Sequence, residues 1–369
     1  MKKTRFSLIL LFLIIPLFIF SQTTFNLTGT VRDAKGKTLP GAHVFLANTT
    51  YGTITNKSGD FNLRIPKRGS YQFVVSFAGF KNYSASLNLI DNTNLKVVLE
   101  VMTTDLGDFE VVSKKDRKWK ERLAQFKQVF LGTSENSKYC EIINEEEIDF
   151  HYDEDQKILE SFSSEPILIR NKALDYDIEF YLEEFKIYYS QAYSVIYGFP
   201  LYKEIFPNRV SRRRDRKRLR AYNGSVEHFF KALSNNTMTE EGFIMRKGFQ
   251  NDLGQLVITN DTILNVVKPE GGLQEIFQWR FKDYFVIDYL EEEDPGYVNY
   301  KYNINLIDTV NTSIDVPSQR SWIRLEDFDV PIQFEKSGYV LNPISFAQYG
   351  YWGFEKIADR VPINYRPKQ

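Results

Sequence analysis

Two histidines and one glutamate have the residue types of a zinc site. His151 and Glu154 form a His-x-x-Glu pattern, and His228 could supply a third ligand from further along the chain. Two imidazoles and a carboxylate leave zinc one open position, where a bound water becomes the nucleophile of a hydrolase. Too few residues precede His151 to form the early strands of a catalytic α/β domain. We therefore favour a strand-end histidine beside a solvated acidic turn.

The densest charge in the sequence is a basic segment that has eight positive charges in twelve residues, opposed only by Asp215. Its members are Arg209, Arg212, Arg213, Arg214, Arg216, Lys217, Arg218 and Arg220. Arginine guanidinium groups match the geometry of phosphates and carboxylates. The segment is either a charged helical or loop face or a site for an anionic partner, such as lipid headgroup phosphates or acidic glycans.

The remaining candidates for chemistry are weaker. An acidic stretch between Glu141 and Asp155 lacks the glycine turn of a calcium loop, so solvated strand edges explain it. Cys140 stands in a predicted strand, which favours a core cysteine over a nucleophile. No G-x-S-x-G, P-loop or G-x-G-x-x-G pattern is present. No cofactor is predicted.

The first residues predict export. Lys2, Lys3 and Arg5 precede an apolar run over residues 8–20, followed by Ser21. This pattern is typical of a cleavable signal peptide over residues 1–21. No cysteine stands near the cleavage point to carry a lipid anchor, and no later apolar stretch is long enough to span a membrane. One cysteine in 369 residues fits a bacterial envelope, periplasmic or associated with the outer membrane, and export excludes nucleic acid as the partner.

Short alternating strands, separated by turn residues, occupy residues 22–102. Apolar residues recur at every second position, as at Leu27, Gly29 and Val31, and glycine, proline and asparagine stand between the runs. About seven strands at this spacing predict a small all-β sandwich.

This stretch resembles the carboxypeptidase-regulatory-like domain, a transthyretin-like β-sandwich. The resemblance rests on Gly29-x-Val31-x-Asp33-x-x-Gly36, Leu39-Pro40-Gly41-Ala42-x-Val44, Asn48-Thr49-Thr50-x-Gly52-Thr53-x-Thr55-Asn56-x-x-Gly59-x-Phe61 and Val75-Ser76-Phe77-Ala78-Gly79-Phe80. In such domains the glycines and prolines set turns and do no chemistry. The family occurs beside some zinc carboxypeptidases and before the plug and barrel of many TonB-dependent receptors of the Bacteroidetes type.

Residues 103–112 form a predicted linker and resemble the segment that leads into a receptor plug. Only 257 of the 369 residues follow position 112, too few for a plug and a 22-stranded barrel. The resemblance therefore does not imply a receptor.

Residues 113–369 are predicted to form one α+β domain with a large antiparallel sheet. Trp119, Leu123, Phe126 and Phe130 have helical spacing, and a second helix should begin after an N-cap at Ser225. Strands are expected at residues 148–152, 157–162, 167–170, 176–180 paired with 185–189, 277–290, 297–306, 321–325 and 332–334. The segments Phe130-Leu131-Gly132, Ala221-Tyr222-Asn223-Gly224-Ser225 and Gly350-Tyr351-Trp352-Gly353 resemble the C-terminal portion of exported Bacteroidetes proteins that carry the same regulatory-like domain.

The sequence thus favours a non-catalytic exported envelope protein that binds or scaffolds a protein or polysaccharide partner. Two alternatives stay open. One is a zinc carboxypeptidase-like hydrolase that uses His151, Glu154 and His228. The other is a glycan-binding module whose aromatic side chains stack on sugar rings.

Overall fold

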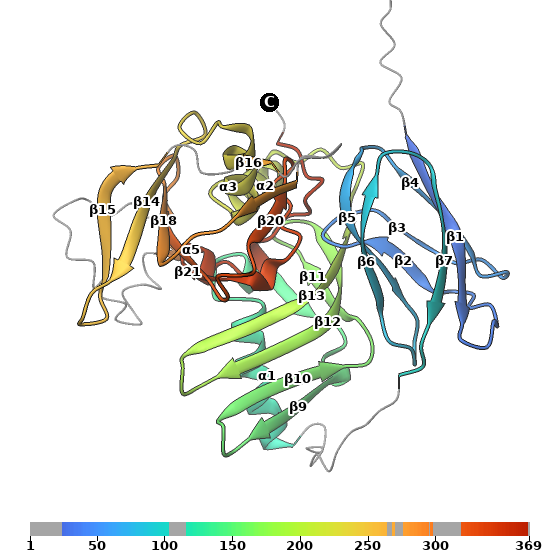
Figure 1. Ribbon diagram of the computed structural model, residues 1–369. Coiled ribbons are helices and arrows are strands. Elements are labelled where there is room, and N and C mark those ends of the chain that lie inside the picture. Colours follow the sequence, from blue (N-terminus) through green and yellow to red (C-terminus); the bar gives the residue numbers. More distant parts are fainter. Residues whose placement is uncertain are drawn as a thin grey trace, which may run out of the picture.

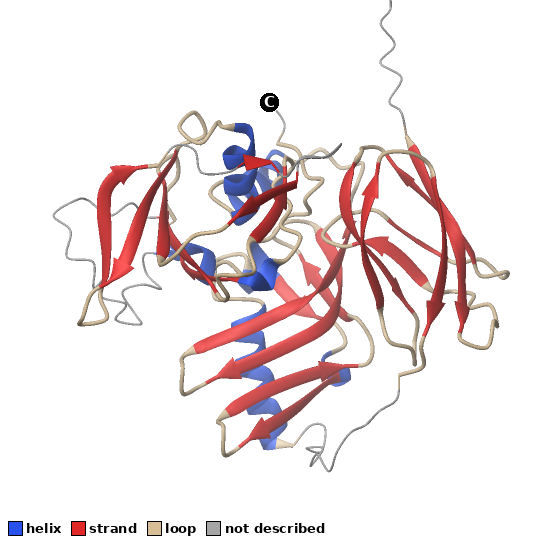
Figure 2. Ribbon diagram, in the orientation of Figure 1, coloured by secondary structure: helices blue, strands red, loops and turns tan. Residues whose placement is uncertain are grey.

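The computed structural model describes residues 24–102, 116–263, 268–269, 276–294, 296–297 and 319–367, and strands make up most of their regular structure (Figure 1, Figure 2). The predicted signal peptide, residues 1–21, and the predicted linker, residues 103–112, lie outside these ranges. Among the described helices, none has the length and apolar character needed to cross a membrane.

The predicted seven-stranded sandwich lies at the N-terminal end of the described chain. Its strands are β1 (Phe25–Asp33), β2 (His43–Leu46), β3 (Gly52–Ile54), β4 (Asp60–Ile65), β5 (Gly69–Ser76), β6 (Tyr83–Leu89) and β7 (Thr93–Leu99). They form two sheets, ordered β4-β1-β7 and β3-β2-β5-β6. Buried side chains alternate along β1 and β4 because successive residues of a strand point to opposite faces. Leu27, Val44 and Phe73 belong to the resulting core.

A six-stranded antiparallel sheet follows, with helix α1 (Arg117–Phe130) along one face (Figure 2). Its strands are β8 (Cys140–Ile142), β9 (Ile148–Asp153), β10 (Ile158–Ser163), β11 (Ile167–Asn171), β12 (Tyr176–Tyr188) and β13 (Tyr193–Glu204). The helix prediction is confirmed: Asp116 accepts a hydrogen bond from the Trp119 amide at the N-terminus, and the four predicted apolar residues are buried. They pack on the sheet and form one core with it.

The predicted pairing of residues 176–180 with 185–189 is wrong. Both segments belong to β12, a single strand whose alternation is interrupted by a β-bulge between Leu182 and Glu184. Its partner along the whole length is β13, which the sequence analysis did not predict. The bulge inserts one extra residue and so resembles a turn in the sequence pattern.

The last part of the chain contains two further antiparallel sheets. The five-stranded sheet has the order β15-β14-β18-β19-β21, and the three-stranded sheet has the order β16-β17-β20. The elements are α2 (Arg212–Tyr222), α3 (Val226–Asn235), β14 (Phe243–Gln250), β15 (Leu256–Thr262), β16 (Lys268–Pro269), β17 (Ile276–Trp279), β18 (Tyr284–Tyr289), β19 (Gln319–Leu325), β20 (Ile332–Glu335), β21 (Phe346–Gly350) and α5 (Tyr351–Phe354). Short 3₁₀ turns occur at Ser137–Tyr139, Glu145–Glu147, Pro343–Ser345 and Ile357–Asp359.

Helix α3 confirms the predicted N-cap, since the Ser225 hydroxyl accepts a hydrogen bond from the His228 amide. The single strand predicted over residues 277–290 is instead two strands, β17 and β18, which belong to different sheets. Asp283, in the turn between them, has a positive φ of 62° that a continuous strand does not permit. Most of the predicted strand 297–306 lies outside the described residues.

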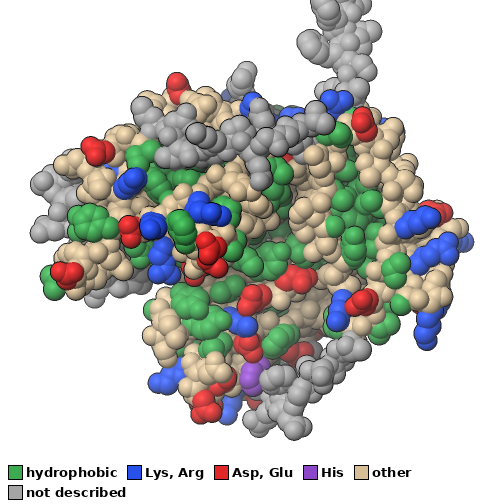
Figure 3. All heavy atoms as spheres, viewed as in Figure 1, with side chains coloured by type: hydrophobic (Ala, Val, Ile, Leu, Met, Phe, Trp, Pro, Cys, Tyr) green, Lys and Arg blue, Asp and Glu red, His purple; other side chains and the backbone are tan. Residues whose placement is uncertain are grey.

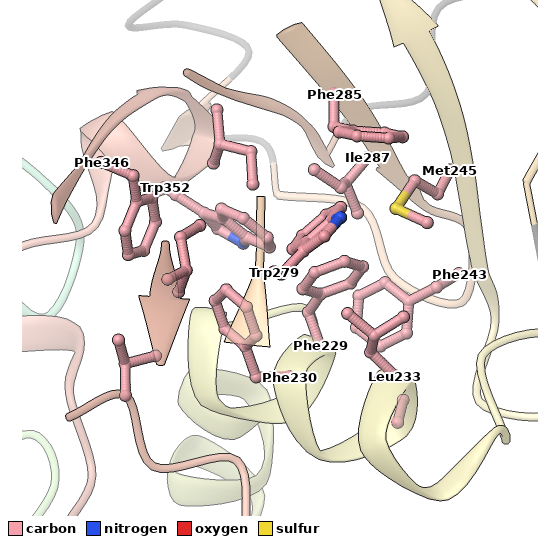
Figure 4. Packing of buried hydrophobic residues seen from close by; sticks show 14 of the residues in the cluster. Phe229, Phe230, Leu233, Phe243, Met245, Trp279, Phe285, Ile287, Phe346 and Trp352 are labelled. Carbon is pink, nitrogen blue, oxygen red and sulfur yellow. The ribbon is translucent and has the colours of Figure 1, made fainter. Parts of the chain in front are cut away.

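The predicted fold class, an all-β sandwich followed by an α+β part with a large antiparallel sheet, is confirmed, and the described residues after the sandwich form sheets of six, five and three strands. The six-stranded sheet packs on α1, whereas the five- and three-stranded sheets share a separate aromatic core with α3 (Figure 4). Whether residues 113–369 fold as one domain stays a prediction.

The sandwich packs against the face of the six-stranded sheet formed by β12 and β13 (Figure 1). The shared buried cluster contains Phe45, Ala47, Val74, Tyr181, Phe199 and Leu201. Backbone bonds cross the same junction: the Asn48 amide donates to the Pro200 carbonyl at 2.7 Å, and the Tyr202 amide donates to the Thr49 carbonyl at 2.9 Å. Directional bonds as well as apolar burial therefore hold the sandwich in place.

Candidate anion-binding surface on helix α2

The basic segment folds into helix α2 and the loop before it. Ser211 caps the helix by accepting a hydrogen bond from the Arg214 amide at 3.3 Å. The buried residues of α2 are Arg214, Arg218, Ala221 and Tyr222, which have helical spacing. A helix usually has apolar side chains on its buried face, but two of the four buried residues of α2 are arginines.

Arg218 is the main attachment of α2 to the six-stranded sheet. Its side chain is 5% exposed, and its Nη1 lies 2.6 Å from Glu204 Oε1. The same guanidinium donates to the carbonyls of Leu174 and Asp175 at 2.8 and 3.2 Å, and it lies 3.8 Å from the centroid of the Tyr176 ring. An anion from solution has little access to a charge so enclosed.

Four further members of the basic segment contact groups within the protein. The guanidinium of Arg209 lies 5.6 Å from the centroid of the exposed Phe206 ring. Arg214 is buried and donates to the Phe206 carbonyl at 3.0 Å. Arg220 Nε lies 2.7 Å from Glu292 Oε1. Lys217 Nζ lies 4.7 Å from the centroid of the Tyr139 ring, and its pKa is lowered by burial and by the Arg213 charge.

These contacts correct the set of eight candidate anion-binding residues, because Arg214 and Arg218 are buried. Arg214 and Arg218 are turned inward because α2 has too few apolar residues to form a buried stripe without them. Long arginine side chains can bury their methylene groups while the guanidinium finds hydrogen-bond acceptors.

Exposed residues of the segment, without Arg220 because it pairs with Glu292, form together with the preceding Phe206 what we call the α2 outer surface. It comprises four arginines and three apolar side chains: Arg209, Arg212, Arg213, Arg216, Phe206, Val210 and Leu219. Val210 is 87% exposed. The sequence analysis missed the apolar members because it considered charge alone, although the positions of Val210 and Leu219 within the basic segment, and of Phe206 just before it, were a usable signal.

The candidate zinc ligands do not form a site. His228 Nδ1 accepts a hydrogen bond from the Gly224 amide at 3.1 Å, so the proton is on Nε2, which lies 2.7 Å from Glu241 Oε2. Burial lowers the pKa of His228, which agrees with this neutral form. Both ring nitrogens are thus engaged, and neither offers a lone pair to a metal.

His151 and Glu154 do not converge either. His151 is on β9, and Glu154 is exposed in the turn that follows. The two residues would share one face on a helix, but here the strand ends between them. Within the described ranges, no group of three or more His, Cys, Asp and Glu side chains is arranged to hold a metal ion.

Cys140 and the acidic stretch have structural surroundings. The Cys140 thiol is half-buried, and its pKa is raised to about 12, first by burial and then by the Asp359 charge, so it is not a thiolate nucleophile. Glu141 pairs with Lys172 at 3.0 Å, and Glu145 pairs with Lys127.

Charges of both signs are also interspersed on the face drawn in Figure 3, as the net charge of −1 suggests.

A buried carboxyl should make stability depend on pH. Burial raises the pKa of Asp359 from 3.8 to about 6, although Ser134 Oγ and Asn136 Nδ2 donate to it at 2.7 and 3.0 Å. The folded state therefore binds this proton more tightly than the unfolded state. Its contribution to the free energy of unfolding is fully present below the unfolded pKa of 3.8 and is lost as the pH rises through about 6.

We expect Asp359→Asn to remove this loss, because an amide can keep the same hydrogen bonds without a charge. From about pH 4 to pH 7, the free energy of unfolding of the parent should fall by up to about 3 kcal/mol relative to that of the variant. Urea unfolding at several pH values measures this, and exposed Asp91→Asn controls for net charge. Parallel pH curves for Asp359→Asn and the parent would contradict the prediction.

The fold is that of a β-rich protein with an N-terminal sandwich. Residues 27–112 match the family model of the CarboxypepD_reg-like domain, so this segment is a domain of that family, as the sequence resemblance implied. That domain is a non-catalytic fold.

A curated relative, the TonB-dependent receptor SusC of Bacteroides thetaiotaomicron, is 34% identical over 116 residues. The match covers 29% of this chain and 11% of SusC, so the chain spans about a tenth of that relative's length.

Two solved structures show only distant similarity. A DUF3823 family protein from Bacteroides ovatus is 11% identical and has a TM-score of 0.19 over 50% of this chain and 82% of its own. A putative membrane-associated protein of unknown function from Bacteroides fragilis is 16% identical and has a TM-score of 0.17 over 43% and 65%. Scores this low do not establish a common fold.

Proposed function

We propose that this chain is a non-catalytic exported protein of the cell envelope that holds a protein or polymer partner, and that the α2 outer surface binds it to anionic lipid headgroups. One observation carries the proposal: four exposed arginines lie among exposed apolar side chains on α2 and the loop before it, and other, buried arginines attach this helix to the protein. The predicted signal peptide and the similarity of one segment to SusC support an envelope location.

The apolar members of the surface favour lipid over an acidic polysaccharide. Phe206, Val210 and Leu219 can enter the boundary between headgroups and acyl chains, while the arginines pair with phosphates. A sugar polymer would satisfy the arginines but leave Val210 exposed to water.

The hydrolase alternative loses its third ligand, because both His228 nitrogens are hydrogen-bonded.

Co-sedimentation with vesicles tests the proposal. The chain should bind vesicles that contain phosphatidylglycerol and not vesicles of phosphatidylcholine alone. Each arginine contributes about 1 kcal/mol near an anionic surface, so Arg212→Gln/Arg213→Gln/Arg216→Gln should weaken binding by about a hundredfold at low salt. These side chains are exposed, so the fold should be retained.

A matched control removes three exposed charges from the sandwich: Lys35→Gln/Lys37→Gln/Arg64→Gln. It should bind vesicles as the parent does. If both triple variants lost vesicle binding equally, net charge alone would explain the loss, and the assignment of lipid binding to the α2 outer surface would be overturned. Binding to an acidic polysaccharide without binding to vesicles would also overturn it, in favour of a glycan partner.

A further inference from the structure

A cavity of about 70 Å³ lies where three distant parts of the chain meet. The sandwich contributes the start of β5 and residues before it, the turn after β20 contributes a second wall, and the C-terminal segment contributes a third. Figure 1 shows β5 beside β20 in this part of the molecule. Its main polar lining residues are Tyr51, Lys67, Tyr71, Glu335, Tyr339 and Arg366. The space is sufficient for several water molecules, or for one small charged group with attached atoms.

The charge in this cavity is unbalanced toward positive. Lys67 and Arg366 both line it, and the pKa of Lys67 is lowered first by the Arg366 charge, then by burial and by Lys231. Both residues are exposed at the cavity wall, and an anion between them would offset their mutual repulsion. Arg68 adds a third cation to the wall.

Glu335 is the carboxylate of the wall, but its oxygens already accept hydrogen bonds. Oε1 accepts from the Ser70 amide at 2.5 Å, and Oε2 accepts from Ser337 Oγ at 3.2 Å. Burial raises its pKa. It is one carboxylate beside three cations that line the same cavity, Lys67, Arg68 and Arg366. Glu335 therefore joins β20 to the sandwich and leaves the cations without full compensation.

The rest of the wall consists of neutral groups. Burial raises the pKa values of Tyr51, Tyr71 and Tyr339, so their phenols stay protonated and can donate or accept hydrogen bonds. Their rings provide apolar surface for the carbon part of a ligand. Cations at one place and aromatic rings around them are suited to a small organic anion.

We infer that this cavity binds a small organic anion, whose carboxylate or phosphate group lies between Lys67 and Arg366 and whose carbon skeleton contacts the tyrosines. The site is independent of the α2 outer surface and does not rest on the proposed function. Because its walls come from residues 47–71, 335–339 and 363–366, the ligand ties the sandwich to the C-terminal segment. Binding should therefore raise the thermal unfolding temperature.

Isothermal titration and thermal unfolding of the whole chain, with four probes, test the inference. Glucuronate presents a carboxylate and glucose 6-phosphate a phosphate, glucose is the neutral counterpart, and inorganic phosphate lacks the carbon skeleton. At least one of the two sugar anions should bind more tightly than both glucose and inorganic phosphate, and whichever is tighter identifies the anionic group. Equal binding of glucose, or no binding of either sugar anion at millimolar concentration, would overturn the inference.

Variants locate the site. A charge-assisted hydrogen bond lost from the anion should weaken binding by about tenfold or more in Lys67→Gln and in Arg366→Gln. Lys96→Gln, exposed on β7 outside the cavity, should bind as the parent does. Unchanged affinity in both cavity variants would refute the site even if the anion binds elsewhere. The Arg212→Gln/Arg213→Gln/Arg216→Gln variant should keep this binding, which separates the result from that of the vesicle experiment.

Discussion

Asp288→Ala is expected to lower the free energy of unfolding by about 3–5 kcal/mol, measured by urea denaturation. Asp288 on β18 is 1% exposed and lies directly opposite Arg320 on β19, itself 3% exposed. Arg320 donates to both carboxylate oxygens at 2.6 and 2.9 Å, and Arg246 Nη1 donates at 2.8 Å. The substitution would leave two arginine charges without their anion, one of them deep in the interior.

A surface pair of similar geometry provides the control. Arg170 donates to both oxygens of Asp177 at 2.9 and 3.2 Å, but the two side chains are 45% and 38% exposed. Asp177→Ala should cost less than about 1 kcal/mol, because water replaces the lost partner. The comparison isolates burial as the cause of the difference. Similar losses in the two variants would contradict this explanation.

The second large effect is expected at Trp279, at the centre of the aromatic core (Figure 4). Its side chain is 2% exposed, and its ring centroid lies 4.8 Å from those of Phe281 and Phe285. Phe229 and Phe230 of α3 also contact it. Trp279→Ala should lower the free energy of unfolding by about 3–5 kcal/mol, because the lost apolar burial is joined by the cost of the cavity.

Two variants control for this prediction. Trp279→Phe keeps most of the apolar contact and should cost clearly less than the alanine variant. Phe249→Ala removes an aromatic ring that is 44% exposed, and a change of within about 0.5 kcal/mol is expected. If Trp279→Ala were no more harmful than Phe249→Ala, the aromatic cluster would not be the core of this part of the chain.

The N-terminal sandwich could be predicted because its pattern is local. Each strand alternates within a few residues, and glycines stand where the backbone requires them. Gly29 is one example: a Cβ there would lie 2.1 Å from the Leu95 carbonyl oxygen on the neighbouring strand. Helices α1 and α3 were also predictable, since an N-cap and a stripe of apolar residues are contained in each segment.

The partner of β12 could not be predicted in the same way. Its bulge resembles a turn, and β13 is rich in small and aromatic residues without a strict alternation of burial. Pairing between strands depends on neighbours that a window of sequence does not contain. The same reason explains why the division of the later strands into sheets of six, five and three strands was not predicted.

The sequence by itself determined the class of the N-terminal domain, the helices α1 and α3 with the Ser225 cap of α3, the basic character of residues 209–220 and the lack of a familiar catalytic motif. Only the tertiary structure decided which arginines of that segment face solvent, that His228 has no free nitrogen, and that Lys67 and Arg366 line one cavity. The physical reason is that local patterns record the conformation of a few neighbouring residues. Burial, charge pairing and cavities depend on segments such as residues 67 and 366, which only the complete fold brings together.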